Sequence, residues 1–208
     1  TFLIVFCFLV SLQLSAQKYF TRSGMTQFEA SEKAFEPIEA LNTSTTVILD
    51  ANNGNIVSQV FMAGFQFKNA LMQEHFNENY MDSYQYPKAT FKGKLDNFSI
   101  VSLDANNSYD LNGVLNVKGF EKNIQTTVDV KVENDQIFIS GSFFVSAKDF
   151  NIKIPSIVRD KIANQIQINI DYELIENVSD TKRTRDFNVL VKVPLIVSAI
   201  VENSCACT

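Results

Sequence analysis

Apolar and polar residues alternate with a period of two along much of the chain. In the segment NIQTTVDVKV, one set of alternate positions is apolar or Thr: Ile124, Thr126, Val128, Val130 and Val132. The same alternation recurs at 110–117, 137–145 and 164–174. This period is typical of β-strands that bury one face and expose the other. The pattern therefore predicts a protein built mainly from half-buried strands.

The segments between these strands are rich in Asn, Asp and Gly. They lie at 50–55, 104–108, 117–123 and 133–136. Such residues tolerate the left-handed backbone angles of tight turns. Parallel neighbours would need connections of about a dozen residues or more, so links this short favour antiparallel pairing.

Two segments have a helical pattern instead. Residues 69–80 carry apolar side chains at one-turn spacing, and Asn69 is a candidate N-cap. Residues 156–163 follow Pro155 and place their apolar side chains near one side. Many strands, two short helices and no strand–helix alternation predict a barrel or a sandwich.

The chain begins with an apolar run. Residues 1–16, TFLIVFCFLVSLQLSA, carry no charge and end in small residues before Gln17. This composition predicts the hydrophobic core and cleavage end of a signal peptide, and the run is short for a membrane-spanning helix. We expect a mature chain that starts near Gln17 and is periplasmic or secreted. Cys7 lies inside the run and does not follow the cleavage point, so lipid attachment is not expected.

Charge and cysteine content exclude several classes of function. The chain has 18 basic and 23 acidic residues, a formal charge of -5, and no basic clusters typical of nucleic-acid binders. After the leader only Cys205 and Cys207 remain, and His75 is the single histidine. A zinc site of the usual Cys and His type would lack ligands, so we expect no metal and no cofactor.

Phenylalanine is unusually frequent, with 18 residues and no Trp in the chain. In the segment SQVFMAGFQF, 58–67, alternation would place Phe61, Phe65 and Phe67 on one face of a single strand. These rings either pack a solid core or line a ligand cavity, since apolar pockets use the same residues. Periodicity alone favours the packed core.

Residues 72–93, MQEHFNENYMDSYQYPKATFKG, carry a family resemblance. An acidic helix end, then Tyr-Pro, then a strand with alternating Ala, Phe and Gly resemble the YceI-like family of exported polyisoprenoid-binding proteins. The flanking segments agree, with an F-x-F strand at 65–67, LNGVLNVKG at 111–119 and KDFNIKIP at 148–155. The resemblance spans about residues 18–175.

This resemblance implies an all-β fold, an extended antiparallel lipocalin-like barrel of about eight strands with one or two short helices. Its long apolar cavity would take the tail of an isoprenoid lipid, often with a quinone or pyrophosphate head. We accordingly expect a signal peptide at 1–16, a barrel domain at 17–176 and a C-terminal tail at 177–208. The expected cavity-lining residues are Phe61, Phe65, Phe67, Phe91, Leu115, Ile139 and Phe143.

Three functions remain open, in the following order. The first is non-catalytic carriage of a polyisoprenoid or isoprenoid-quinone type of lipid. The second is an envelope interaction or structural protein whose filled barrel binds a protein partner. The third is a lipid-modifying enzyme, an isomerase or cyclase, in which His75 acts as a base beside Glu74 or its same-face neighbour Glu78.

The predicted helix is interpreted as a clasp or lid over the barrel rather than a catalytic element. No Ser or Cys stands as an evident nucleophile near His75. As a lid at the barrel mouth, the helix would present polar side chains to a lipid headgroup: His75, Asn77, Asn79 and Tyr80.

The end of the chain has no counterpart in the resemblance. Residues 180–208 hold a basic run and then a mostly apolar run, 187–201, interrupted by Lys192 and Pro194. That run is short for a transmembrane helix. It is interpreted as a loosely packed tail, an added edge strand, a surface-association segment or a translated frameshift. Exposed strand edges or this tail could support a homodimer.

Overall fold

A computed structural model describes residues 17–31, 37–100 and 106–177. The chain divides into two units, residues 1–176 and 177–208, and the fold below is that of the first. The predicted signal peptide and nearly all of the predicted tail lie outside the described residues.

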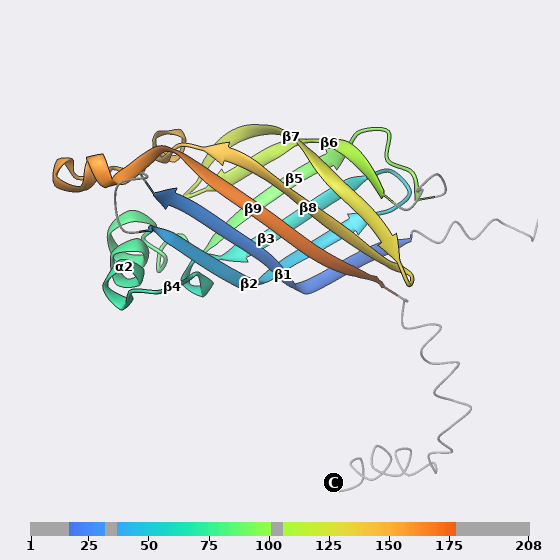
Figure 1. Cartoon of the computed structure of the whole chain (residues 1–208), viewed down its shortest axis with the longest axis horizontal. Helices are drawn as coiled ribbons and strands as arrows, with labels where there is room; N and C mark the ends of the chain where they lie inside the picture. The colour runs from blue at the N-terminus through green and yellow to red at the C-terminus, as the bar shows by residue number, and fades with distance from the viewer. Residues whose placement is uncertain (1–16, 32–36, 101–105, 178–208) are drawn as a thin grey trace, which may run out of the picture. The chain divides into compact units, whose positions relative to one another are not determined.

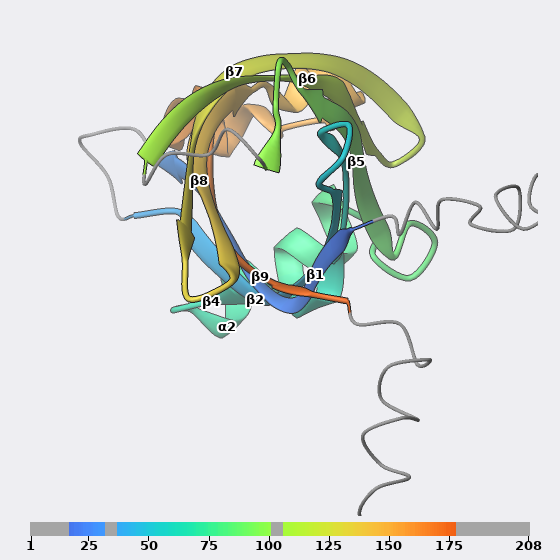
Figure 2. The ribbon, with the colours of Figure 1, turned by 90° about the vertical axis from the view of Figure 1, so that its right-hand side faces the viewer.

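The described residues form nine strands, eight of which close into a barrel. The strands are β1 (Lys18–Ser31), β2 (Glu39–Asp50), β3 (Asn55–Phe61), β4 (Gln66–Phe67), β5 (Lys88–Leu95), β6 (Asn106–Val117), β7 (Phe120–Glu133), β8 (Gln136–Val145) and β9 (Ile162–Glu176). Their order is β1-β9-β8-β7-β6-β5-β3-β2, and pairing of β1 with β2 closes the ring shown in Figure 2. Every pairing is antiparallel, and the two-residue β4 adds to β2 outside the ring. The predicted fold class is confirmed.

Tight turns join the long hairpins where the sequence predicts them. Asn134 and Asp135, between β7 and β8, have φ of 51° and 63°. Lys118 and Gly119, between β6 and β7, have φ of 53° and 80°. Two consecutive left-handed residues match the right-handed twist of paired strands, which is why Asn, Asp and Gly occur there.

The alternating segments bury the faces that their patterns predict. On β7, Val128 and Val130 are each 1% exposed, whereas the intervening Asp129 is exposed. The register continues this buried layer across the sheet, because Val130 pairs with Ile139 on β8 and Ile139 pairs with Tyr172 on β9.

The helical segments lie in the connections. The predicted helix at 69–80 consists of α2 (Ala70–His75) and the π-helical turn η2 (Phe76–Tyr80). Its predicted N-cap is confirmed, because Asn69 Oδ1 accepts a hydrogen bond of 2.9 Å from the Leu71 amide. The segment predicted as a helix at 156–163 is the 3-10 helix η5 (Ser156–Lys161). Further 3-10 turns are η1 (Met62–Gly64) and η4 (Ala147–Phe150).

The phenylalanine-rich segment 58–67 is not one strand, which corrects the prediction. β3 ends at Phe61, η1 turns the chain, and β4 follows. The buried Asn42 amide fixes this bend by donating a 3.1 Å hydrogen bond to the Phe61 carbonyl. A Cβ on Gly64 would come within 2.6 Å of Asn42 Nδ2, so the close approach requires glycine. The break in alternation puts Phe61 and Phe65 in different environments.

The two ends of the barrel differ. One end, which we call the helix end, carries α2, η1, η2, η4 and η5 (Figure 1). The other, the hairpin end, carries the β7–β8 turn and the β2–β3 turn at residues 51–54 (Figure 1).

Candidate functional site

A cavity of about 160 Å³ lies inside the barrel, in its helix-end half. Every barrel strand except β7 contributes to its wall, and residues of η4 reach it from the connection after β8. The contributing positions on β9 are Ile166, Ile168, Ile170 and Tyr172, which extend from the helix-end part of that strand to just past its middle. Within the described residues, none of those that line this lumen carries a charge. The lumen is therefore an apolar binding space.

Glycines on two neighbouring strands determine where one large wall residue lies. Gly93 of β5 pairs with Gly113 of β6. A Cβ on Gly93 would come within 2.6 Å of the Phe91 ring, and one on Gly113 within 2.5 Å. The ring therefore lies close against this glycine pair, and a side chain at either position would displace Phe91 from the wall.

The hairpin-end half of the barrel is filled instead. Apart from Ile56 and Leu111, which reach the lumen, its inward side chains are almost fully buried and do not line it: Val47, Leu49, Leu95, Val128, Val130, Ile137, Ile139 and Leu174. Each of these is at most 1% exposed. Close packing of branched aliphatic side chains therefore closes the lumen on this side.

Hydroxyl groups lie where the lumen meets the filled half. Thr26 Oγ1 is 2.8 Å from Thr45 Oγ1 and 3.3 Å from the Tyr172 hydroxyl. Burial raises the pKa of Tyr172 above its usual value, although hydrogen bonds with Thr26 and Ser58 act in the opposite direction. The phenol thus stays neutral, and this hydroxyl cluster of Thr26, Thr45, Ser58 and Tyr172 forms an uncharged floor.

A second space, of about 290 Å³, continues from the lumen at the helix end. We call it the vestibule; it lies between α2 and η2 on one side and the segment 147–162 on the other. Lumen and vestibule share wall residues, among them Phe28, Phe76 and Ile152. The vestibule is therefore the route from the lumen toward the helix end.

Aromatic rings stand at the junction of the two spaces. Phe28 and Phe76 stack with ring centroids 5.3 Å apart and an interplanar angle of 23°. Phe65 and Phe67 pack against the same two rings, at centroid distances of 5.1 to 5.8 Å. Such contacts stabilise the junction beyond simple burial and leave it wholly apolar.

Five of the seven residues predicted to line a cavity do lie on these spaces. Phe65, Phe91, Leu115 and Phe143 border the lumen, and Phe67 borders the vestibule. The other two do not. Phe61 is 47% exposed, with the Lys88 ammonium 5.0 Å from its ring centroid, because its neighbour Val60 faces the lumen and successive side chains of a strand point to opposite faces. Ile139 is fully buried in the filled half, because it lies four residues nearer the hairpin end than Phe143.

The four predicted lid residues separate into two pairs. His75 and Tyr80 border the vestibule. Asn77 is engaged within its own segment, donating to the Gln73 carbonyl at 2.9 Å and accepting from the Ser83 hydroxyl at 2.7 Å. Asn79 is exposed and does not border the vestibule.

Several wall residues were not predicted from the sequence. Phe28, Phe76 and Met81 border both spaces, and Lys161 borders the vestibule. Alternation on β9 already predicts that Ile166 and Ile168 face inward, so this signal was available. No sequence pattern distinguishes Phe28 from the other phenylalanines.

Two kinds of feature were not found in the part of the chain that the structure describes, a metal-binding cluster and a membrane-spanning helix. Across 17–31, 37–100 and 106–177, no three His, Cys, Asp or Glu side chains gather where they could hold a metal ion. In the same ranges no helix has the length and apolar character needed to cross a membrane.

Comparison with known proteins adds a family and a fold. A family model described as a YceI-like domain matches residues 19–174. The polyisoprenoid-binding domain from Saccharophagus degradans, implicated in plant cell wall breakdown, superimposes with a TM-score of 0.66 at 12% identity, covering 77% of this chain and 98% of that one. Burkholderia cenocepacia BcnA gives a TM-score of 0.60 at 16% identity, covering 72% and 95%. No curated protein matches the sequence.

Proposed function

Because this chain belongs to the YceI-like family and half of its barrel is hollow, we propose that it binds and carries a long apolar lipid of the polyisoprenoid type. The hollow, uncharged lumen is the observation that carries the proposal. The structurally similar Saccharophagus domain is described as polyisoprenoid-binding, which supports the same class of ligand.

Burial of hydrocarbon is sufficient to hold such a ligand. Each methylene removed from water contributes about 0.8 kcal/mol, before the cost of ordering the chain. The lumen and vestibule share walls, so a chain longer than either space can extend from one into the other. The branched methyl groups of an isoprenoid match walls built from Phe, Ile, Leu and Val.

The walls also favour one orientation of the ligand. A charged or strongly polar headgroup would lose its hydration in the uncharged lumen without gaining a partner of opposite charge. The vestibule offers His75, Tyr80 and Lys161 as polar contacts. We therefore place the apolar tail toward the hydroxyl floor and the headgroup at the vestibule. Asn77 and Asn79 have no part in this arrangement.

The proposed function is not enzymatic. The vestibule brings His75 and Tyr80 together with apolar side chains, and no carboxylate borders it among the described residues. As a general base, His75 would have no acidic partner in the vestibule, because neither Glu74 nor Glu78 borders it. The alternative of a filled barrel that binds a protein partner fits only the hairpin-end half.

We further propose, from the predicted signal peptide at 1–16, that the protein acts in the periplasm or after secretion.

Native mass spectrometry of protein purified from the envelope of the cells that make it tests the proposal. We expect a copurified isoprenoid at near one-to-one occupancy, identified after organic extraction. Delipidated protein should then bind added geranylgeraniol. A ligand-free mass that does not change on adding geranylgeraniol or geranylgeranyl phosphate would contradict lipid carriage.

Placement of the headgroup at the vestibule is tested by comparing the binding of two ligands, one with a charged headgroup and one without. Substituting His75 by Ala and Lys161 by Gln should weaken binding of geranylgeranyl phosphate and leave binding of geranylgeraniol nearly unchanged. Asn79→Ala serves as the control on the same segment and should change neither. Equal losses for both ligands would contradict a headgroup at the vestibule.

A further inference from the structure

The segment that forms one side of the vestibule has two chemically different faces. Its inner face closes the vestibule with apolar side chains: Ile152, Ile154, Val158 and Ile162. Its outer face borders a surface groove that shares Ile152, Ile154 and Ile162 with the vestibule and adds the cations Lys148, Lys153 and Arg159. We call this segment, residues 146–162, the η5 rim. The rim thus places positive charge directly beside the opening to an apolar space.

The cations of the η5 rim are available for an external partner. Lys148, Lys153, Arg159 and Lys161 are all exposed. Within the described residues, none of the four forms a salt bridge. Asp149 is engaged by Lys122, so Asp160 is the one carboxylate of the rim without a salt bridge to a cation of the described ranges. A local excess of positive charge therefore exists on a chain whose net charge is -5.

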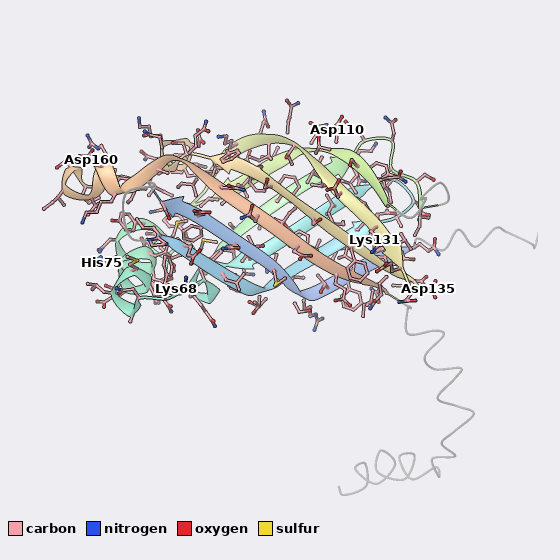
Figure 3. The ribbon with its side chains drawn as sticks, viewed as in Figure 1. Lys68, His75, Asp110, Lys131, Asp135 and Asp160 are labelled. Carbon is pink, nitrogen blue, oxygen red and sulfur yellow. The ribbon has the colours of Figure 1, made fainter. Side chains whose placement is uncertain are left out.

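An apolar side chain projects from the same rim. Ile157 is 87% exposed. It belongs to η5, which extends beyond the strands at the helix end (Figure 1), and the label of its neighbour Asp160 marks this projecting tip in Figure 3. An exposed aliphatic residue flanked by cations is the combination that inserts at a lipid headgroup boundary.

The rest of the surface would orient the molecule. Among the described residues, carboxylates outnumber cations around the hairpin end, where Figure 3 labels Asp135 and Lys131 and where β7 and β9 end in Glu133 and Glu176. On the opposite side of the vestibule, α2 carries Glu74 and η2 carries Glu78. A negatively charged surface would therefore attract the η5 rim and repel both the hairpin end and α2, which is electrostatic steering by an uneven charge distribution.

We propose that the η5 rim docks on an anionic lipid bilayer, with Ile157 inserted and Lys148, Lys153, Arg159 and Lys161 on the headgroups. In this orientation the vestibule opens beside the membrane, and a lipid can pass between bilayer and lumen with little exposure to water. This inference rests on the proposed lipid carriage for its purpose, but docking itself is measured independently.

Flotation with vesicles of phosphatidylglycerol and phosphatidylcholine tests the charge. Each cation near an anionic surface strengthens binding about fivefold, so the double variant Lys153→Gln, Arg159→Gln should bind roughly 25-fold more weakly. The control Lys92→Gln, Lys94→Gln makes the same change in net charge on two exposed residues of β5 and should bind as the unsubstituted protein. At about 1 M salt the Debye length falls to about 3 Å and vesicle binding should decrease strongly.

The apolar contact is tested separately. Ile157→Ser should weaken vesicle binding about fivefold, because an aliphatic side chain no longer leaves water. The control Ile175→Ser removes a residue that is 46% exposed at the hairpin end and should have no effect. All variants are identical outside the substituted positions, so a difference between them reports on the substituted residues.

Either of two results would overturn docking: equal binding by the rim variants and the unsubstituted protein, or equal losses in rim and control variants. Geranylgeraniol binding, measured without vesicles, separates this outcome from failure of the proposed function. Retained geranylgeraniol binding with no rim-dependent flotation rejects docking and leaves lipid carriage intact. Rim-dependent flotation without geranylgeraniol binding supports docking and rejects carriage.

Discussion

The two halves of this barrel are made by the same strands but have different interiors. On β8, Ile139 is fully buried in the hairpin-end half, whereas Phe143, on the same face, borders a cavity. On β9, Leu174 is fully buried and Ile166 borders the lumen. Alternation along a strand therefore determines which side chains point inward, and does not determine whether they meet other side chains or open space.

The difference arises from side-chain size and from the connections. In the hairpin-end half, Val, Leu and Ile fill the cross-section at the density of a protein interior. In the helix-end half, the wall rings stay at the side: Phe91 lies over Gly93 and Gly113. Tyr172 lies between the halves. Its ring packs close to Gly24, where an added Cβ would come within 2.7 Å of the ring.

The largest expected effect comes from truncating matched residues of β8. Ile139→Ala should lower the free energy of unfolding by about 3 kcal/mol, because it leaves a void in a packed region. Phe143→Ala should cost about 1–2 kcal/mol, because one side of the ring already borders open space. Urea unfolding with unchanged m-values measures both.

Ligand binding should show the reverse order for the same pair. Phe143→Ala should weaken geranylgeraniol binding about tenfold, equivalent to about 1.4 kcal/mol. Ile139→Ala should leave it nearly unchanged at a temperature where the variant is folded. If both variants lose stability and affinity in parallel, the division into a filled and a hollow half is wrong.

A smaller effect is expected from enlarging a side chain in each half. Val130 is 1% exposed in the filled half, and Val130→Phe should destabilise the protein by about 2 kcal/mol through overpacking. Val60 borders the lumen, so Val60→Phe should change stability by less than about 0.5 kcal/mol and block geranylgeraniol binding by filling the cavity. Thermal unfolding and ligand titration of both variants check this, and a Val60→Phe protein that still binds tightly would contradict it.

Sequence patterning predicted the architecture because each local signal agreed with the barrel. The alternation on β7 and β9, the turns at Asn134 and Gly119, and the Asn69 cap are all local features. Each depends on residues within a few positions of one another, so one sequence is enough to read them.

The position of the cavity depends on contacts between different strands and connections, which the pattern along a single strand does not reveal. Ile139 and Phe143 have the same pattern on β8, and only the distance to the hairpin end separates them. Phe61 was assigned inward because alternation was extended across a bend that Asn42, far away in sequence, fixes by a hydrogen bond. Resemblance to the family suggested a cavity, but it did not indicate which half is hollow.

The smallest expected effect on stability comes from Tyr172, which lies between the filled half and the hollow half of the barrel. Tyr172→Phe removes a hydroxyl that lies 3.3 Å from Thr26 Oγ1, and should cost about 1 kcal/mol because Thr26 keeps its partner Thr45. Tyr19→Phe is the control in the filled half, since Tyr19 is buried but has no hydrogen bond from its hydroxyl to another described residue. It should be close to neutral.

The pKa shift of Tyr172 adds a pH dependence to this comparison. Burial raises the pKa, so the folded state favours the neutral phenol. The stabilisation is complete below the unfolded pKa of about 10 and is lost as pH rises above it. Tyr172→Phe should therefore lose less stability between neutral and strongly alkaline pH than the unsubstituted protein, as denaturant midpoints would show.

The same variant also tests which end of the lipid reaches the floor. If the tail lies there, Tyr172→Phe leaves an apolar surface beneath it, and geranylgeraniol affinity should stay equal or rise slightly. If the lipid hydroxyl lay there instead, it would lose a hydrogen-bond partner and affinity should fall about tenfold, since an unpaired buried hydroxyl costs about 1–3 kcal/mol. A fall of that size would place the headgroup at the boundary between the halves and reverse the orientation proposed for the ligand.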